Sequence, residues 1–387
     1  MISGRVLSSG GAILLTALLI VVAAVVLVPV EQWDVVGMVI MAILPVFLVV
    51  ALVALALAAV SYRLGRRLPA GLLAVVITCT AVVISVPLVS QWRTADAYGV
   101  RLSLWDALFS QLNLGEPDLS RSVTYAMPDG RELRLDVWEA PRAGDEPRPA
   151  VVWVHGGSWS GGTRGAAPKW NKWFNDRGYT VFDIEYRLSP QPNWQAAPAD
   201  VACALGWVKA HAADYQVDPS RVILAGRSAG AHLALHVGYA VAADAPFQPS
   251  CPLGDPTVAA VVALYGPTDL VRAWRVSSPR WKRPLENYLG GTPDEVADRY
   301  RRSSPVHDVR LGLPPTLLAH GERDTIVSHE QMTLLAAALE RVDAPHTAVS
   351  LPYALHAFDV AWGNVNTQIT RHVLDRFLAE HVPVEGR

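Results

Sequence analysis

The chain has 387 residues, of which 51% are hydrophobic and 18% charged, and its formal net charge is −2. Only six of the charged residues lie within residues 1–92, although these make up almost a quarter of the chain. This composition excludes a disordered chain, a coiled coil, a disulfide-dense miniprotein and a nucleic-acid binder steered by bulk charge. The uneven distribution of charge predicts a membrane segment joined to a soluble domain.

Three charge-free runs fill the first part of the chain: Val6–Val30, Val35–Tyr62 and Leu68–Trp92. Each is longer than the ~20 residues that a helix needs to cross the hydrocarbon core of a bilayer. Pro45 lies inside the second run, where a membrane helix tolerates a kink. We therefore predict that residues 1–92 are a membrane anchor with three transmembrane helices.

The orientation of the anchor follows from its few charged residues. Arginines precede the first run and fill the turn after the second, whereas the turn after the first run is acidic: Arg5, Arg63, Arg66 and Arg67, against Glu31 and Asp34. Loops rich in Lys and Arg stay in the cytoplasm. Three crossings then place everything after Trp92 outside, so we predict a multi-pass protein of the cell membrane with an extracytoplasmic soluble domain.

The segment 93–120 is predicted to be a connector. Apolar residues within Arg101–Leu112 recur at helical spacing, which indicates an amphipathic helix. Such a helix lies on the membrane or packs on the soluble domain, and the second interpretation is favoured. The soluble domain holds two cysteines, Cys203 and Cys251, and both a disulfide and two buried thiols are compatible with the sequence.

Residues 121–387 alternate between strand and helix patterns. Strands are predicted at 132–140, 150–154, 179–186, 222–225, 258–264, 316–319 and 347–351. Helices are predicted at 169–177, 196–213, 228–242, 328–342 and 365–381. Such alternation predicts an α/β domain, a mostly parallel sheet with helices on both faces. The segment 269–313 interrupts the alternation and is predicted to be a lid or cap insertion.

The sharpest chemical signal is the run Gly226–Gly230, which reads GRSAG and lies between a predicted strand and a predicted helix. This is the context of a nucleophile elbow, a turn so tight that only glycines fit beside the serine. We predict Ser228 as the nucleophile. The competing interpretation is a turn serine that only caps the helix.

A glycine pair follows an earlier strand, in the run His155–Trp159. Backbone N–H groups turned inward there can hold the oxyanion of a tetrahedral intermediate together with the N–H group after the nucleophile. We predict Gly157, Ser158 and Ala229 as the oxyanion donors. His155 itself is interpreted as a structural residue of this loop.

A catalytic triad needs an acid and then a histidine later in the chain. Asp324 and His356 each follow a predicted strand at its carboxyl end, where a parallel sheet collects functional side chains. His356 would accept the proton of Ser228, and Asp324 would orient its imidazole. His320 and Glu322 are expected only near the site, and Asp269 is a weaker acid candidate that is better interpreted as a turn or cap residue.

Four sequence motifs together resemble those of a known enzyme family. From about Leu119 onward the chain resembles α/β-hydrolase-fold carboxylesterases, in the branch of hormone-sensitive-lipase-like esterases, isoprenylcysteine methylesterases and kynurenine-formamidase-like enzymes. The matching blocks are HGGSW at 155–159, DIEYRL at 183–188, DPSR at 218–221 and GRSAGAHL at 226–233. Two residues depart from the hormone-sensitive-lipase pattern, Ser158 in place of a third glycine and Arg227 in place of an acid.

We therefore predict a membrane-anchored serine hydrolase that cleaves short to medium acyl esters, with a small-molecule or lipid ester as substrate. The alternatives are an envelope amidase or acyltransferase using the same triad, and a non-catalytic hydrolase-fold binding module. The sequence implies no cofactor, metal or nucleic acid and leaves the oligomeric state open. His232 and His236 share a helix face and are interpreted as core residues.

Overall fold

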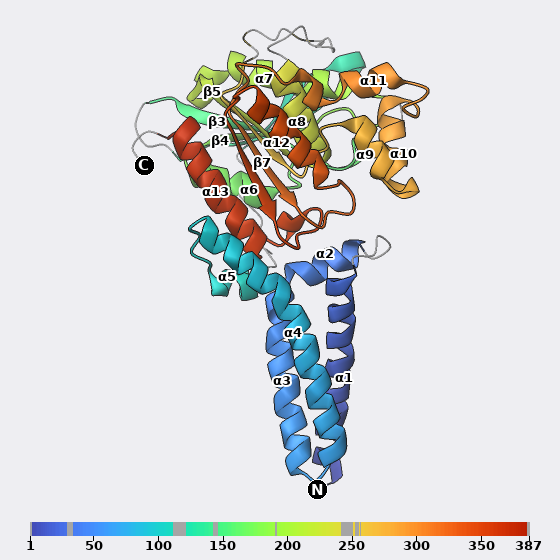
Figure 1. Ribbon diagram of the computed structural model, residues 1–387. Coiled ribbons are helices and arrows are strands. Elements are labelled where there is room, and N and C mark those ends of the chain that lie inside the picture. Colours follow the sequence, from blue (N-terminus) through green and yellow to red (C-terminus); the bar gives the residue numbers. More distant parts are fainter. Residues whose placement is uncertain are drawn as a thin grey trace. The chain divides into compact units, whose positions relative to one another are not determined.

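The structure is a computed structural model that describes residues 2–28, 34–110, 121–141, 146–189, 192–240, 251, 255 and 257–384 (Figure 1). The chain divides into two compact units. The first unit comprises residues 1–113, 321–325 and 351–372, and the second comprises residues 114–320, 326–350 and 373–387. Each unit is described by itself below.

Five helices form most of the first unit: α1 (Ile2–Leu27), α2 (Asp34–Ala42), α3 (Leu44–Arg63), α4 (Arg67–Ala97) and α5 (Leu104–Phe109). Helices α1, α3 and α4 pack on one another, with a buried seam that includes Leu19, Leu44 and Ile84. Large apolar side chains also point outward from these helices, as at Leu52, which is 67% exposed. A helix that is apolar on all faces suits lipid or the centre of a protein, and not water.

The second predicted span is broken in the structure. Helix α2 ends at Ala42 and α3 begins at Leu44, with Ile43 between them in a non-helical conformation. The cause is Pro45, because proline has no N–H group to donate to the carbonyl oxygen four residues earlier, that of Met41, and its ring clashes with that carbonyl group. The kink expected at Pro45 within Val35–Tyr62 is thus a break between two helices, of which only α3 is long enough to cross a bilayer.

Only part of the three-span prediction is confirmed. Among the described residues, two helical stretches are long and apolar enough to cross a bilayer, Leu44–Arg63 and Pro69–Ala97. Helix α1 contributes a shorter apolar stretch, Gly11–Leu27. Glu31, used in the orientation argument, and residues 111–120 of the predicted connector lie outside the described residues. Helix α5 is shorter than the helix predicted over Arg101–Leu112.

The second unit is built on an eight-stranded sheet in the order β1-β2-β4-β3-β5-β6-β7-β8. Its strands are β1 (Arg121–Ala126), β2 (Leu133–Trp138), β3 (Arg148–Val154), β4 (Thr180–Ile184), β5 (Val217–Arg227), β6 (Ala260–Leu264), β7 (Thr316–Gly321) and β8 (His346–Leu351). The pairings of β4 with β3, β3 with β5, β5 with β6 and β6 with β7 are parallel, and β2 is antiparallel to both of its neighbours. The predicted mostly parallel sheet is confirmed.

The helices between the strands are α6 (Pro168–Asn175), α7 (Ala196–Ala210), α8 (Ala229–Ala240), α9 (Leu270–Val276), α10 (Pro279–Leu289), α11 (Ala297–Arg302) and α12 (Glu330–Arg341), and α13 (Val365–His381) follows the last strand. Helices α7 and α8 pack on each other and on β5, while α6 packs on β2 and β4 (Figure 1). The central strands are buried on both faces, which explains their unbroken apolar runs. The segment 269–313, the cap segment, folds into α9, α10, α11 and a short 3₁₀ helix.

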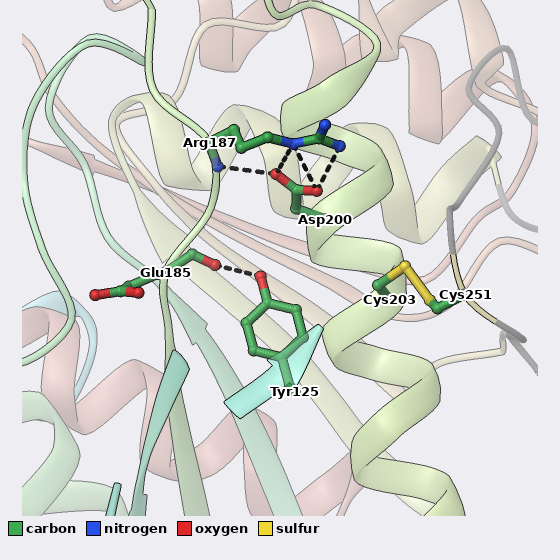
Figure 2. The surroundings of a disulfide bond; sticks show 6 residues. All are labelled: Tyr125, Glu185, Arg187, Asp200, Cys203 and Cys251. Atoms are coloured by element: carbon green, nitrogen blue, oxygen red, sulfur yellow. Dashed lines mark hydrogen bonds and ion pairs between the residues drawn. A yellow bond between two sulfur atoms is a disulfide. The ribbon is translucent and has the colours of Figure 1, made fainter. Parts of the chain in front are cut away.

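Strand β1 was not predicted from the sequence. It lies at the edge of the sheet and buries one side chain, Tyr125, so its sequence lacks the alternation that marks a half-buried strand. The two cysteines of the second unit are joined. Cys203 of α7 forms a disulfide with Cys251 (Figure 2), and their Cα atoms are 5.7 Å apart, within the range that such a bond requires.

Candidate active site

Ser228 occupies a tight turn between β5 and α8. Its φ angle is 52°, in the left-handed region that non-glycine residues rarely adopt. A Cβ atom at Gly230 would lie 2.1 Å from the carbonyl oxygen of Val154, and one at Gly226 would lie 2.5 Å from the carbonyl oxygen of Gly230. Strand and helix thus approach so closely that only glycine fits on both sides of the serine. This is the geometry of a nucleophile elbow.

The loop after β3 is also held in an uncommon conformation. Gly157 has a φ of 130°, and the next two residues, Ser158 and Trp159, have φ angles of 54° and 56°. A Cβ atom at Gly157 would lie 2.1 Å from the carbonyl oxygen of Gly161. Backbone strain of this kind persists where the surroundings fix it and is frequent at functional sites.

One pocket joins the elbow, this loop and the cap segment. Its volume is about 460 Å³ including its mouth. It is lined by Ser158, Trp159, Ser228, Ala229, Pro267, Ala273, Ser277, Trp281, Pro284, Leu285, Ile326, Val327 and Ser328. Ala229 is the first residue of α8, and the first N–H groups of a helix have no acceptor within the helix. Two of the three predicted oxyanion donors, Ser158 and Ala229, line the pocket together with Ser228. The third, Gly157, is exposed and directly precedes Ser158 in the chain.

Trp159 forms a buried wall of this pocket. Its indole N–H group donates to Nδ1 of His232 at 3.2 Å, and its ring stacks on Tyr288 of the cap segment with centroids 4.6 Å apart. Because Nδ1 of His232 accepts, Nε2 carries the hydrogen and donates it to the carbonyl oxygen of Ser303 at 2.7 Å. Burial lowers the pKa of His232 to about 3, so the ring stays neutral.

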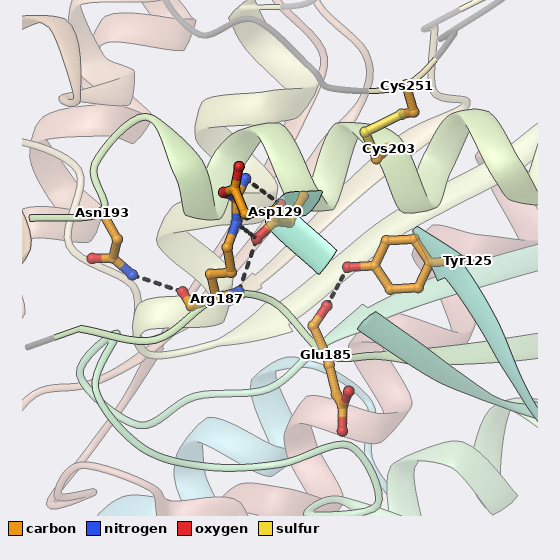
Figure 3. A network of polar contacts seen from close by, with 8 residues as sticks. Tyr125, Asp129, Glu185, Arg187, Asn193, Cys203 and Cys251 are labelled. Carbon is orange, nitrogen blue, oxygen red and sulfur yellow. Dashed lines mark hydrogen bonds and ion pairs between the residues drawn. A yellow bond between two sulfur atoms is a disulfide. The ribbon is translucent and has the colours of Figure 1, made fainter. Parts of the chain in front are cut away.

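The residues of the DIEYRL block brace the loop that carries Trp159. The ring of Tyr186 stacks on His155, and its hydroxyl donates to the carbonyl oxygen of His155 at 3.1 Å. Arg187 forms an ion pair and several hydrogen bonds with the buried carboxylate of Asp200 (Figure 2). Nη2 of Arg187 lies 2.8 Å from Oδ1 of Asp200. Asn193 donates to the carbonyl oxygen of Arg187 at 2.7 Å (Figure 3).

These supporting roles went beyond what the sequence indicated. Asp200 lies on a helix predicted from the sequence, from which an ion pair with a nearby loop was the most that could be expected, and His232 was interpreted only as a core residue. The DIEYRL block served only as a motif of the resembled family, and no structural role was predicted for its residues. Trp170 and Trp173 are buried in α6 against other aromatic rings, the packing that their place on a predicted helix favoured over a role in the pocket.

In the first unit, the predicted acid and histidine meet. Nδ1 of His356 lies 2.7 Å from Oδ2 of Asp324, and both residues are buried. With the carboxylate accepting, the imidazole hydrogen sits on Nδ1, which makes Nε2 the nitrogen that can take a proton. The weaker acid candidate, Asp269, caps α9 instead by accepting the N–H of Arg272 at 3.0 Å. His320 contacts the carbonyl oxygen of Val327.

Ser228 belongs to the second unit, and the roles assigned to it and to the Asp324–His356 pair stay predictions. Within the described part of the chain, no group of three or more His, Cys, Asp or Glu side chains is arranged to hold a metal ion. His232 and His236 are both buried, and their rings stack on each other.

Relatives of the chain include ester hydrolases. The probable carboxylic ester hydrolase LipM of Mycobacterium tuberculosis is 32% identical over 65% of this chain and 59% of its own length. Esterase LipC of the same organism is 32% identical over 67% of this chain and 64% of its own length. The chain thus spans about 60% of the length of these curated relatives. The comparison supports the predicted ester-hydrolysing enzyme.

Solved structures agree with this assignment. Esterase Est2 of Thermogutta terrifontis is 26% identical and superimposes with a TM-score of 0.59, covering 69% of this chain and 94% of its own. Structures of that esterase include propionate-bound and butyrate-bound forms and a form phosphonylated by sarin. The model of the BD-FAE family matches residues 135–339, which is more than half of the chain and contains both the elbow and the loop after β3. The chain belongs to the BD-FAE family, on an α/β-hydrolase fold.

Proposed function

We propose that this protein is a membrane-anchored serine carboxylester hydrolase with Ser228, His356 and Asp324 as its catalytic triad. The observation that carries the proposal is Ser228 itself. It stands at a glycine-flanked elbow and lines a pocket together with Ser158 and the first residue of α8, Ala229. A serine that only capped a helix would need neither the left-handed turn nor the pocket.

The proposed reaction runs in two steps through an acyl-enzyme. Oγ of Ser228 attacks the ester carbonyl carbon while Nε2 of His356 takes the hydroxyl proton, and the carbonyl electron pair moves onto oxygen. The N–H groups of Gly157, Ser158 and Ala229 are assigned to that oxyanion. When the tetrahedral intermediate collapses, the alcohol leaves with the proton from His356. Water then attacks the acyl group, gives a proton to His356, and the acid is released as Ser228 regains its proton.

The substrate class follows from the side chains that line the pocket around Ser228. The Trp159–Tyr288 stack and the cap residues Trp281 and Leu285 form apolar walls. The propionate-bound and butyrate-bound forms of the similar Est2 support small acyl groups. We therefore assign short to medium acyl esters.

The test is a series of p-nitrophenyl esters from acetate to palmitate, assayed with the detergent-solubilised full chain, beside p-nitroanilides of the same acyl groups. The highest kcat/KM is expected within the short to medium esters, with anilides slower. Efficient cleavage of long-chain triacylglycerol emulsions with interfacial activation would contradict the assigned substrate class. Faster anilide cleavage would favour an amidase.

The anchor and its orientation are part of the proposal. The apolar helices α3 and α4, the arginines between them and the Cys203–Cys251 disulfide support a catalytic domain on the oxidising side of the cell membrane. Protease added to intact spheroplasts is expected to remove the domain after Trp92. Protection of that domain until the membrane is lysed would contradict the proposed orientation.

A further inference from the structure

The acid–histidine pair lies on two short segments that pack against the N-terminal helices of the first unit. Helix α2 contacts the 3₁₀ helix η5 (Phe358–Val360), which follows His356 closely in the chain. A small pocket beside His356 is walled on one side by Met41 of α2. Its remaining lining comes from Tyr353, Ala354, Leu355, His356, Phe358, Asn364 and Asn366.

Arg323 ties the segment of the acid to helix α1. Its guanidinium group donates to the carbonyl oxygen of Val26, in the last turn of α1, and lies 4.0 Å from the ring centroid of Tyr353. The last carbonyls of a helix lack partners within the helix, and a cation there is also favoured by the helix dipole. The bond therefore satisfies the end of α1 and fixes the residue next to Asp324.

Two further contacts tie the segment of the histidine to α4 and α2. Gln91 is a buried polar residue on the apolar helix α4, and its Nε2 atom donates to the carbonyl oxygen of Pro352 at 3.5 Å. On α2, Gly37 is packed so closely that an added Cβ atom would lie 3.1 Å from Cδ1 of Leu355. Leu355 is the neighbour of His356. Helices α1, α2 and α4 thus each contact a residue close to the pair.

We propose that these N-terminal helices are the scaffold that positions the Asp324–His356 pair, so that they serve catalysis and are more than a membrane tether. The inference rests on the proposed function, because it needs His356 to be the catalytic base. Arg323 and Gly37 are positioning residues in this account. A displacement of about 1 Å in a catalytic group can cost ~10²-fold in rate, so a modest shift of Leu355 or Arg323 is expected to lower kcat.

Gly37→Val provides the first test, with Gly71→Val as its matched control. Both exchange a helical glycine for the same residue, but nothing lies within 4 Å of a Cβ atom at Gly71, whereas Leu355 lies beside Gly37. In the full chain in detergent, G37V is expected to lower kcat at least tenfold with KM changed less than twofold. G71V is expected to stay within twofold of the wild type in both constants.

The second test uses Arg323→Gln and Arg323→Lys. Glutamine removes the cation at the end of α1, whereas lysine restores one that can reach the same carbonyl oxygen. We expect R323Q to lose kcat at least tenfold and R323K to recover most of it, with the melting temperatures of both variants reported. If G37V does not fold, the comparison of R323Q with R323K alone tests the positioning role of the N-terminal helices.

The outcomes separate the inference from the function on which it rests. An inactive wild type overturns both. An active wild type with G37V and R323Q both within twofold of it overturns the positioning role alone. Losses in G37V and R323Q at unchanged KM, with recovery in R323K and a normal G71V, support the inference.

Discussion

The surroundings of Ser228 and those of His356 are built in contrasting ways. Ser228 sits between a buried strand and a helix, where backbone atoms leave no room for a side chain at Gly226 or Gly230. His356 sits on a loop whose neighbours are held by side-chain contacts from helices more than 250 residues away in the chain. The nucleophile is thus fixed locally by its own backbone, whereas the base depends on distant parts of the chain.

The largest expected effect tests whether these two regions serve one reaction. Ser228→Ala and His356→Ala should each lower kcat by at least ~10³-fold, because triad members act as a unit. For the same reason the double variant should be no slower than the single ones. The measurement is p-nitrophenyl ester hydrolysis, with circular dichroism as the control for folding. If H356A kept a tenth of the wild-type rate, the base would be wrongly assigned.

The difference between the two regions also explains what the sequence predicted. Gly226–Gly230 and His155–Trp159 are local patterns, and the structure has both turns where the motifs indicated them. Asp324 and His356 were inferred from their positions after strands, and the structure brings them together. In both regions the prediction concerned residues near the ends of strands, where spacing along the chain carries the information.

No sequence pattern indicated the contacts that hold these residues in place. The bonds from Gln91 to Pro352 and from Arg323 to Val26 join segments far apart in the chain, so no local pattern records them. A kink at Pro45 was expected from its place inside the apolar run, and the structure shows it as a full break, with α2 ending at Ala42 and α3 beginning at Leu44. The stack of Tyr288 on Trp159 depends on how the cap segment folds, which its irregular sequence did not indicate.

A smaller effect is expected from the ion pair that supports the loop after β3. Arg187→Met removes the guanidinium group from the carboxylate of Asp200, which is 1% exposed, and leaves it only the backbone N–H of residue 187. Breaking such a buried pair costs about 3 kcal/mol of unfolding free energy. Lys172→Met is the control, because its partner Asp176 is 53% exposed and such surface pairs contribute ~0–1 kcal/mol. The unfolding free energies are measured by denaturant unfolding. Equal losses of unfolding free energy in the two variants would show that the Arg187–Asp200 pair does not support the loop after β3.

The smallest expected effect is a change in how stability depends on pH. Burial lowers the pKa of His232 to about 3 from an ordinary value of 6.5, so between these values the unfolded chain binds more protons at this site. The site therefore favours unfolding increasingly as the pH falls from 6.5 toward 3, and its contribution is fully present above 6.5. His232→Asn should give a flatter dependence in this window. An unchanged slope in thermal melts at several pH values would show that the ring is not held neutral by burial.

The most direct test of the central claim is the site and rate of labelling by a fluorophosphonate, measured by mass spectrometry on the full chain. Sarin phosphonylates the similar Est2, which supports the choice of reagent. The account predicts one adduct, on Ser228, no adduct in S228A, and labelling slowed at least ~10²-fold in H356A, because an activated serine needs its base. An adduct on another residue, or an H356A variant labelled at the wild-type rate, would contradict the assignment of nucleophile and base.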